Sequence, residues 1–325
     1  MHSLQRGVSN ILVKTNKNVG TIKKMTVWSR MKEQKYLIAM SAPFVIWVII
    51  FKYLPLTGWA MAFQDYKPQL GITKSPWVGL KHFKVLFKEE QFYQALQNTL
   101  GMSILAIVFS TIFSISFALL LNELRSLKFK RLIQTISYLP HFVSWVVVAN
   151  IVGQILAPTG TINEILMNLH IINTPINFLA KPSMFWGIVT ASDLWKETGW
   201  NAIIYLAAIT GIDMQLYEAA KVDGANRWQQ IKNITLPGIR ATAIILLIMS
   251  IGNLINIGFE KQYLLGNNTV AAKSLVLDKY ALDYGIGMVR YSYGTAIGMF
   301  KSVVGIVLIF IANTLAKKSG EGRLI

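Results

Sequence analysis

Six apolar stretches constrain the fold of this chain more than any other feature. A helix needs about 20 mostly apolar residues to cross a bilayer. Only 14% of the 325 residues are charged, whereas a soluble domain carries about 25%, so lipid is the expected solvent. The sequence therefore predicts an all-α integral membrane protein with six transmembrane helices, at about 37–54, 97–121, 132–157, 185–210, 239–258 and 294–316.

The distribution of positive charge predicts how these helices are oriented. Lys and Arg collect in short cytoplasmic loops, and the loop "NELRSLKFKR" holds four of the 32. Both termini are therefore expected in the cytoplasm, with an extension at 1–36, one transmembrane domain at 37–316 and a tail at 317–325. The net charge of +17 is sorted as in a membrane protein, so we expect lipid and not nucleic acid as a partner.

Several kinds of chemistry are not expected of this chain. It contains no cysteine, which excludes thiol nucleophiles, disulfides and thiolate metal ligands. It has no GxxxxGK[ST] loop for ATP, and its four histidines (2, 82, 141 and 170) have no metal-ligand spacing. We expect no cofactor, no metal and no enzymatic activity in the chain itself.

The polar segment 211–238, between the fourth and fifth predicted spans, interrupts the apolar pattern. Glu218 to Ala220 favour a helix, Asp223-Gly224 indicates a turn, and Trp228, Ile231 and Ile234 suggest one face of a second helix. The pattern predicts a helix–turn–helix elbow on the cytoplasmic side. A simple interfacial helix is the alternative, but such helices are mainly basic. Mixed charge and small side chains favour docking of another protein.

The elbow carries a long motif. Glu218-Ala219-Ala220, then Gly224, Ile234 and Leu236-Pro237, match the EAA signature of ABC importer permeases in every fixed position. "AFQDY", "WVGLKHF", "YLPHFVSW", "LWKETGWNAIIYLAAI", "SIGNLINIGFE" and "AIGMFKSVVGIVLIFIANTLAKKSGEG" resemble the branch that imports oligosaccharides and polysaccharides, with maltose-type permeases as relatives. The resemblance covers nearly the whole chain.

The resemblance implies a division of labour in the cytoplasmic membrane of a prokaryote. The elbow would be a coupling helix seated on a dimer of ATPase subunits, which bind the ATP and Mg. A second permease, expected to be a different chain, and an external solute-binding protein would complete the importer. The residues implied in ATPase docking are Glu218, Ala219, Ala220, Asp223, Gly224, Ala225, Arg227, Trp228, Ile234, Leu236 and Pro237.

The fourth predicted span carries an unusual polar face. Asp193, Lys196, Glu197, Trp200 and Asn201 fall on one side of a helix, and Asp193 and Lys196 are spaced to pair. Ionisable groups in a membrane usually face a cavity or a partner. The face predicts either part of a sugar pathway or an ion-pair network that holds helices together.

The fifth predicted span adds a stripe of Ser250, Asn253 and Asn256, which could equally make interhelical hydrogen bonds. The maltose-type resemblance implies sugar contacts at Lys196, Glu197, Trp200, Ser250 and Asn253. The charges of Lys196 and Glu197 replace an uncharged stretch of those relatives and could instead select a charged sugar.

His141 follows a predicted kink at Pro140 and is either a pathway residue or a structural one. Four glycines, at 252, 258, 294 and 298, suggest close helix packing.

Other functions stay open at this point. A secondary transporter could use Asp193, Lys196 and Glu197 as an ion or proton relay, and an ABC permease could carry amino acids or peptides. A membrane enzyme is disfavoured because carboxylates and histidines do not cluster. The sequence does not specify which sugar would be carried.

Overall fold

The computed structural model describes residues 33–318, so most of the predicted extension at 1–36 and of the tail at 317–325 lies outside the described residues. Within residues 33–318 the regular elements are helices joined by turns and irregular segments, and an isolated antiparallel bridge links Gln64 and Trp77. The chain divides into two units, one up to Thr57 and one from Gly58 onward.

The described part of the first unit is one long apolar helical run, and the last segment of this run extends beyond the unit boundary at Thr57 to Phe63. It comprises α3 (Lys35–Val48), the π-helical turn η1 (Ile49–Tyr53) and the 3-10 segment η2 (Leu54–Phe63). Pro43 lies inside α3. The run from Lys35 to Phe63 is long and apolar enough to cross a membrane, and it extends beyond the span predicted at 37–54.

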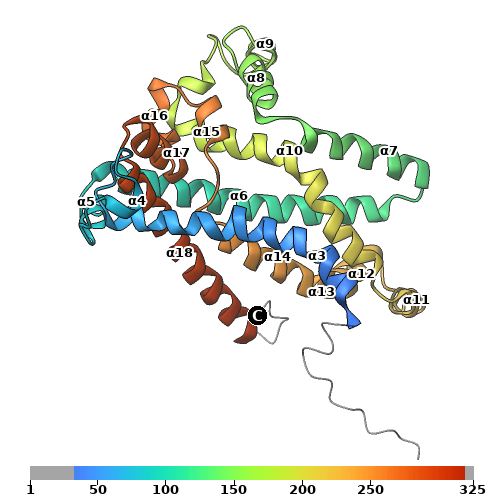
Figure 1. Ribbon diagram of the computed structural model, residues 1–325. Helices are drawn as coiled ribbons and strands as arrows, with labels where there is room; N and C mark the ends of the chain where they lie inside the picture. Colours follow the sequence, from blue (N-terminus) through green and yellow to red (C-terminus); the bar gives the residue numbers. More distant parts are fainter. Residues whose placement is uncertain (1–32, 319–325) are drawn as a thin grey trace, which may run out of the picture. The chain divides into compact units, whose positions relative to one another are not determined.

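The second unit is built on two long helices that lie side by side (Figure 1), α6 (Glu90–Glu123) and α10 (Pro182–Thr210). The longest of its other helices is α18 (Tyr291–Lys318). The remaining elements are α4 (Gly71–Lys74), α5 (Lys81–Leu86), α7 (Leu127–Tyr138), η3 (Leu139–Phe142), α8 (Trp145–Ile155), α9 (Thr161–Asn168), η4 (Phe178–Ala180), α11 (Met214–Val222), α12 (Arg227–Gln230), η5 (Ile231–Thr235), α13 (Leu236–Gly238), α14 (Arg240–Gly252), α15 (Glu260–Leu265), η6 (Asn268–Val270), α16 (Ala271–Ser274), α17 (Leu277–Leu282) and η7 (Asp283–Gly287).

Apolar side chains hold these helices together in clusters along α6. Met102 of α6 packs with Phe185 and Val189 of α10 in one cluster. Ala118 and Ala202 lie in another cluster toward the opposite end of the same two helices. Because both clusters join α6 to α10, this pair forms a fixed frame for the polar groups between them.

The connecting segments gather at two ends of the second unit (Figure 1). α4, α5, α16 and α17 lie near the first turns of α6, where Asn98 donates hydrogen bonds to the carbonyls of Ala272 and Leu275, both at 2.8 Å. The elbow elements α11, α12 and α13 lie near its last turns. The assignment of these two ends to membrane sides stays a prediction.

Membrane spans are the part of the fold that differs most from the sequence prediction. Among the described residues, three helices are long and apolar enough to cross a membrane, or five if each of two bent helix pairs counts as one span. The third predicted span is broken, since Leu127–Phe142 and Trp145–Ile155 meet at 102°. The fifth predicted span begins at a 56° bend, where Arg227–Gly238 meets Arg240–Gly252, and α14 ends at Gly252 instead of near residue 258.

The four glycines do not share one role. A side chain at Gly294 would come within 2.6 Å of the Gly285 Cα, and one at Gly252 would collide with Ile309, so close packing is confirmed at these two positions. Gly298 has open space instead, and Gly258 has a φ of +73° with nothing near it. Close packing was therefore the wrong explanation for Gly258 and Gly298.

Candidate functional site

The charged face of α10 is fully partnered, although not as the spacing predicted. Asp193 pairs with Lys261 of α15, and Lys196 pairs with Glu197 at 3.0 Å. The predicted Asp193–Lys196 pair is wrong, because α15 brings a second lysine to Asp193 from 68 residues away. One ion pair thus joins α10 to α15 and the other lies within α10, and each balances charges among apolar helices.

Lys196 and Glu197 also hold the break in the third predicted span. The Lys196 ammonium donates to the backbone carbonyl of His141 at 2.5 Å, and the His141 Nδ1 lies 2.7 Å from a Glu197 oxygen. The His141 ring stacks on Trp200, with 4.4 Å between ring centroids and 2° between planes. Irregular backbone at membrane depth needs such partners, because no water is available there to replace them. His141 is therefore part of the same cluster as the α10 face.

One aromatic ring lies beside both lysines. The Lys196 and Lys261 ammonium groups lie 6.0 Å and 5.7 Å from the centroid of the Trp145 ring, at the start of α8. This distance is within the range of cation–π attraction. Trp145 was not predicted from the sequence, because nothing in the pattern distinguished it from other tryptophans of an apolar segment.

A polar cavity of about 230 Å³ lies between α6, α10, α14 and α15. Four predicted residues line it, namely Asp193, Glu197, Asn201 and Ser250. Four further polar residues that the sequence analysis missed also line it, namely Ser110, Thr111, Thr190 and Lys261. The four predicted residues outside the lining are Lys196, His141, Trp200 and Asn253. Hydroxyl, amide and charged groups converge there among apolar helices, as a hydrophilic solute requires.

Ser250 and Asn253 do not form the predicted helical stripe with Asn256. α14 ends at Gly252, so Asn253 and Asn256 follow its last turn. Ser250 donates to the Leu246 carbonyl at 2.9 Å, and the exposed Asn253 amide donates to the Met249 carbonyl at 3.2 Å. The sequence analysis did not predict that α14 ends at Gly252, because no proline marks the end of this helix.

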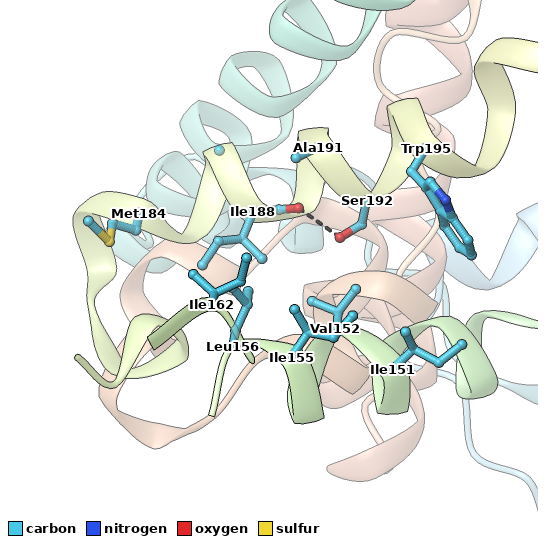
Figure 2. A pocket seen from close by; sticks show the side chains of 11 residues that line it. Ile151, Val152, Ile155, Leu156, Ile162, Met184, Ile188, Ala191, Ser192 and Trp195 are labelled. Atoms are coloured by element: carbon cyan, nitrogen blue, oxygen red, sulfur yellow. Dashed lines mark hydrogen bonds between the residues drawn. The ribbon is translucent and has the colours of Figure 1, made fainter. Parts of the chain in front are cut away.

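A second cavity, of about 620 Å³, lies on another side of α10 against α8 and α9 (Figure 2). Its lining is apolar, with Ile151, Ile155, Ile188 and Trp195 among the side chains. The Ser192 hydroxyl that reaches it already donates to the Ile188 carbonyl at 2.8 Å. This lining offers no set of groups for sugar hydroxyls, so α10 separates an apolar cavity from a polar one.

The predicted elbow begins with a capped helix and turns at Gly224. The Asp213 side chain accepts a hydrogen bond from the backbone amide of Gln215, in the first turn of α11. At the other end the Ala225 amide donates to the Ala220 carbonyl at 2.8 Å, and the Gly224 amide donates to the Lys221 carbonyl at 3.1 Å. These two bonds form a Schellman motif, which requires a left-handed residue. Gly224 has a φ of +77°.

The second arm of the elbow starts at Asn226. Asn226 and Gln229 form a reciprocal capping box, which satisfies two amides at the start of α12. The helix then widens into the π turn η5, so Trp228 is exposed whereas Ile231 and Ile234 are half-buried. The prediction that these three share one face is therefore wrong.

One side-chain contact fixes the elbow to α6, and two others join parts of the elbow to each other. Arg227 pairs with Glu123 at the end of α6 at 2.5 Å. The Tyr217 hydroxyl lies 2.9 Å from the Thr235 hydroxyl, which joins α11 to η5. The Gln230 amide donates to the Ala225 carbonyl at 2.9 Å.

Most of the predicted docking residues face outward. Exposed are Glu218, Ala219, Asp223, Gly224, Arg227, Trp228, Leu236 and Pro237, and half-buried are Ala220, Ala225 and Ile234.

Comparison with known proteins places the chain in a family. Residues 110–320, which include the polar cavity residues and the elbow, match the family described as binding-protein-dependent transport system inner membrane component. The chain belongs to this family. It is a transport permease, as its relatives are.

Three relatives show how far the similarity of this permease extends. It is 46% identical over 290 residues to the polygalacturonan/rhamnogalacturonan transport system permease protein YteP of Bacillus subtilis, covering 89% of this chain and 90% of the relative. A solved bacterial ABC transporter involved in the import of the acidic polysaccharide alginate matches with a TM-score of 0.83 and 39% identity, covering 90% of this permease and 98% of that chain. The alginate transporter in complex with a pentasaccharide-bound periplasmic protein matches with a TM-score of 0.84 and 38% identity, covering 92% and 99%.

Proposed function

We propose that this permease is the transmembrane subunit of an ATP-driven ABC importer that moves oligosaccharides or polysaccharide fragments across the cytoplasmic membrane of a prokaryote. The observation that carries the proposal is the polar cavity between α6, α10, α14 and α15, which holds hydroxyl, amide and charged groups inside an apolar helical unit. The polysaccharide names of the relatives support a saccharide cargo over amino acids or peptides.

The proposed topology has six spans, with α10 as the fourth, in addition to the three long apolar helices and the two bent pairs. α10 is long enough to cross a bilayer, but Asp193, Lys196 and Glu197 lie in its middle. Their pairing within the protein makes the span compatible with lipid. The two bent helix pairs supply the third and fifth spans, and both termini lie in the cytoplasm.

The elbow is proposed to dock on an ATPase subunit. Glu218, Ala219 and the exposed Trp228 would face that subunit, while the Arg227–Glu123 pair transmits its movement to α6. ATP and Mg would bind to the ATPase dimer, and a second permease and an external solute-binding protein would complete the assembly.

His141, Asp193, Lys196, Glu197 and Lys261 form what we call the charged cluster. This cluster and the cavity are proposed as this chain's part of the sugar path. At about 230 Å³ the cavity is smaller than ordinary ligand pockets of about 300–1,000 Å³, so the second permease would supply the rest. The residues proposed to line or shape the path are Lys196, Glu197, Trp200, Ser250, Asn253, Asp193, Asn201 and His141.

The direct test is uptake by the complete transporter in proteoliposomes. We expect saccharide uptake that needs ATP and is lost when the ATPase subunit carries an inactivating substitution. Glu218→Lys should keep the assembly in the membrane but reduce uptake per ATP hydrolysed, because a charge is reversed at the docking surface. Glu164→Lys, an exposed reversal on α9, is the control. Normal coupling in Glu218→Lys would contradict the docking role.

An ion- or proton-coupled secondary transporter is the second candidate, because ionisable groups form a connected cluster in the membrane unit. It predicts uptake that continues with an inactive ATPase and stops when the ion gradient is removed. The same proteoliposomes therefore separate the two functions.

A further inference from the structure

We infer that Lys261 makes the path selective for acidic saccharides, because its ammonium group binds the carboxylate of a uronic acid unit. The inference rests on the proposed function and specifies the cargo more closely. A carboxylate entering a membrane unit needs a positive partner, since an unpaired charge there is costly. The charged cluster contains two lysines that could serve, Lys196 and Lys261.

The ammonium group of Lys196 already has partners within the protein. It forms an ion pair with Glu197 at 3.0 Å and donates to the His141 carbonyl, and the Lys196 side chain is only 7% exposed. Releasing it would leave the carbonyl at the break of the third predicted span without its partner. A sugar carboxylate could reach Lys196 only by disrupting this element.

Lys261 has hydrogen-bonding capacity to spare. An ammonium group has three donors, and among the described residues the hydrogen bond of Lys261 goes to Asp193. Its side chain is 16% exposed and lines the polar cavity. Two donors are thus available beside Ser110, Thr111 and Asn201, whose hydroxyl and amide groups suit the hydroxyls of the same sugar unit.

Asp193 gives the site two properties that a transport path requires. It balances Lys261 when no cargo is present, so that the ammonium is not left alone in an apolar unit. It also repels an incoming carboxylate that shares the ammonium, which keeps binding weak enough for release. Passage through a pore requires sites that bind without trapping.

The test compares trigalacturonate with its methyl ester, supplied together to the complete transporter in proteoliposomes with the same solute-binding protein throughout. The readout is the ratio of acid to ester uptake rates. In the double variant Asp193→Asn/Lys261→Gln, which leaves no unpaired charge, we expect the ratio to fall by about tenfold, the effect of losing one charge-assisted hydrogen bond. Ester uptake should persist, which shows that the variant is folded.

Two further variants show whether a change in the ratio comes from the charge at position 261 or from an indirect effect of substitution. Lys279→Gln changes a partly exposed lysine that pairs with Asp283, and it should leave the ratio unchanged. Lys261→His should give a higher ratio at pH 5.5 than at pH 8, relative to wild type at each pH. The comparison with wild type at each pH removes any effect of pH on the other charged groups of the cluster, namely His141, Asp193, Glu197 and Lys196.

The outcomes separate the inference from the proposed function. An unchanged ratio in the double variant, or equal uptake of acid and ester by wild type, overturns the role of Lys261 while saccharide import stands. A wild-type transporter that imports neither compound in an ATP-dependent manner contradicts the proposed function itself.

Discussion

Gly224 forms the turn predicted at Asp223-Gly224, and the structure gives the reason that glycine is needed there. The sequence suggested that a small residue lets a partner approach closely. The structure gives a φ of +77° and no atom within 4 Å of an added Cβ, so the backbone of the Schellman motif already requires glycine. The two explanations predict different effects of substitution.

Gly224→Val should therefore impair the elbow, whereas Gly224→Asn should be tolerated. A β-branched residue in the left-handed region costs about 1–3 kcal/mol, but asparagine adopts this region readily. Uptake per ATP and trypsin cleavage at Lys221 would be measured for both variants. If asparagine impairs coupling as strongly as valine, the position is limited by room for a partner and not by its backbone.

Lys196 is the residue whose loss should damage the charged cluster most. In Lys196→Met, Glu197 loses its ammonium partner but keeps its contact with His141 Nδ1. The His141 carbonyl loses its donor, which should cost about 1–3 kcal/mol for a buried group left without a partner. The apparent melting temperature of the detergent-solubilised transporter measures this. The double variant Lys196→Met/Glu197→Gln should recover part of the loss, and an equal or larger loss would show that the pair is not coupled.

The sequence predicted which helix face is charged but not how the charges pair. Asp193, Lys196 and Glu197 lie on one helix, so their periodicity was sufficient to group them. The partner of Asp193, Lys261, follows the irregular end of α14, and its distance from α10 depends on tertiary packing. The cavity residues Ser110 and Thr111 were missed for the same reason, because hydroxyls inside an apolar helix usually bond to their own backbone.

Broken helices set the positions of the cavity and the elbow. The sequence predicted the kink at Pro140 and the polar segment 211–238, since proline and charge are local signals. It did not predict the 102° bend, or the end of α14 at Gly252. The bend is held by a contact with α10, whereas Gly252 at the end of α14 packs against Ile309 of α18. Local sequence patterns do not report such tertiary contacts.

The joint between the elbow and α6 can be tested by exchanging its charges. Arg227→Glu should lower uptake per ATP, because it places two acids together at the end of α6. The exchanged pair Glu123→Arg/Arg227→Glu should restore it. The stability change should stay within about 1 kcal/mol, since both side chains are well exposed. Failure of the exchanged pair to rescue coupling would mean that Arg227 acts on another partner.

The complete topology is testable because the chain contains no cysteine. Single cysteines can be placed at exposed positions, Thr174 in the loop after α9 and Gln215 in the elbow. In intact cells, a membrane-impermeant maleimide should label Thr174→Cys and should reach Gln215→Cys only after lysis. Labelling of both in intact cells would contradict six spans with cytoplasmic termini.

α10 continues into the elbow after only Gly211, Ile212 and Asp213, which has a mechanical consequence. At 1.5 Å per residue, Asp193 lies about 30 Å along the helix axis from the start of α11. A tilt of α10 by about 5° about its elbow end would thus displace the Asp193 carboxylate by about 2.6 Å, nearly the length of a hydrogen bond. Small angular movements of the elbow, the proposed docking site of the ATPase, would therefore be sufficient to open or remake the Asp193–Lys261 contact without any change inside α10 itself.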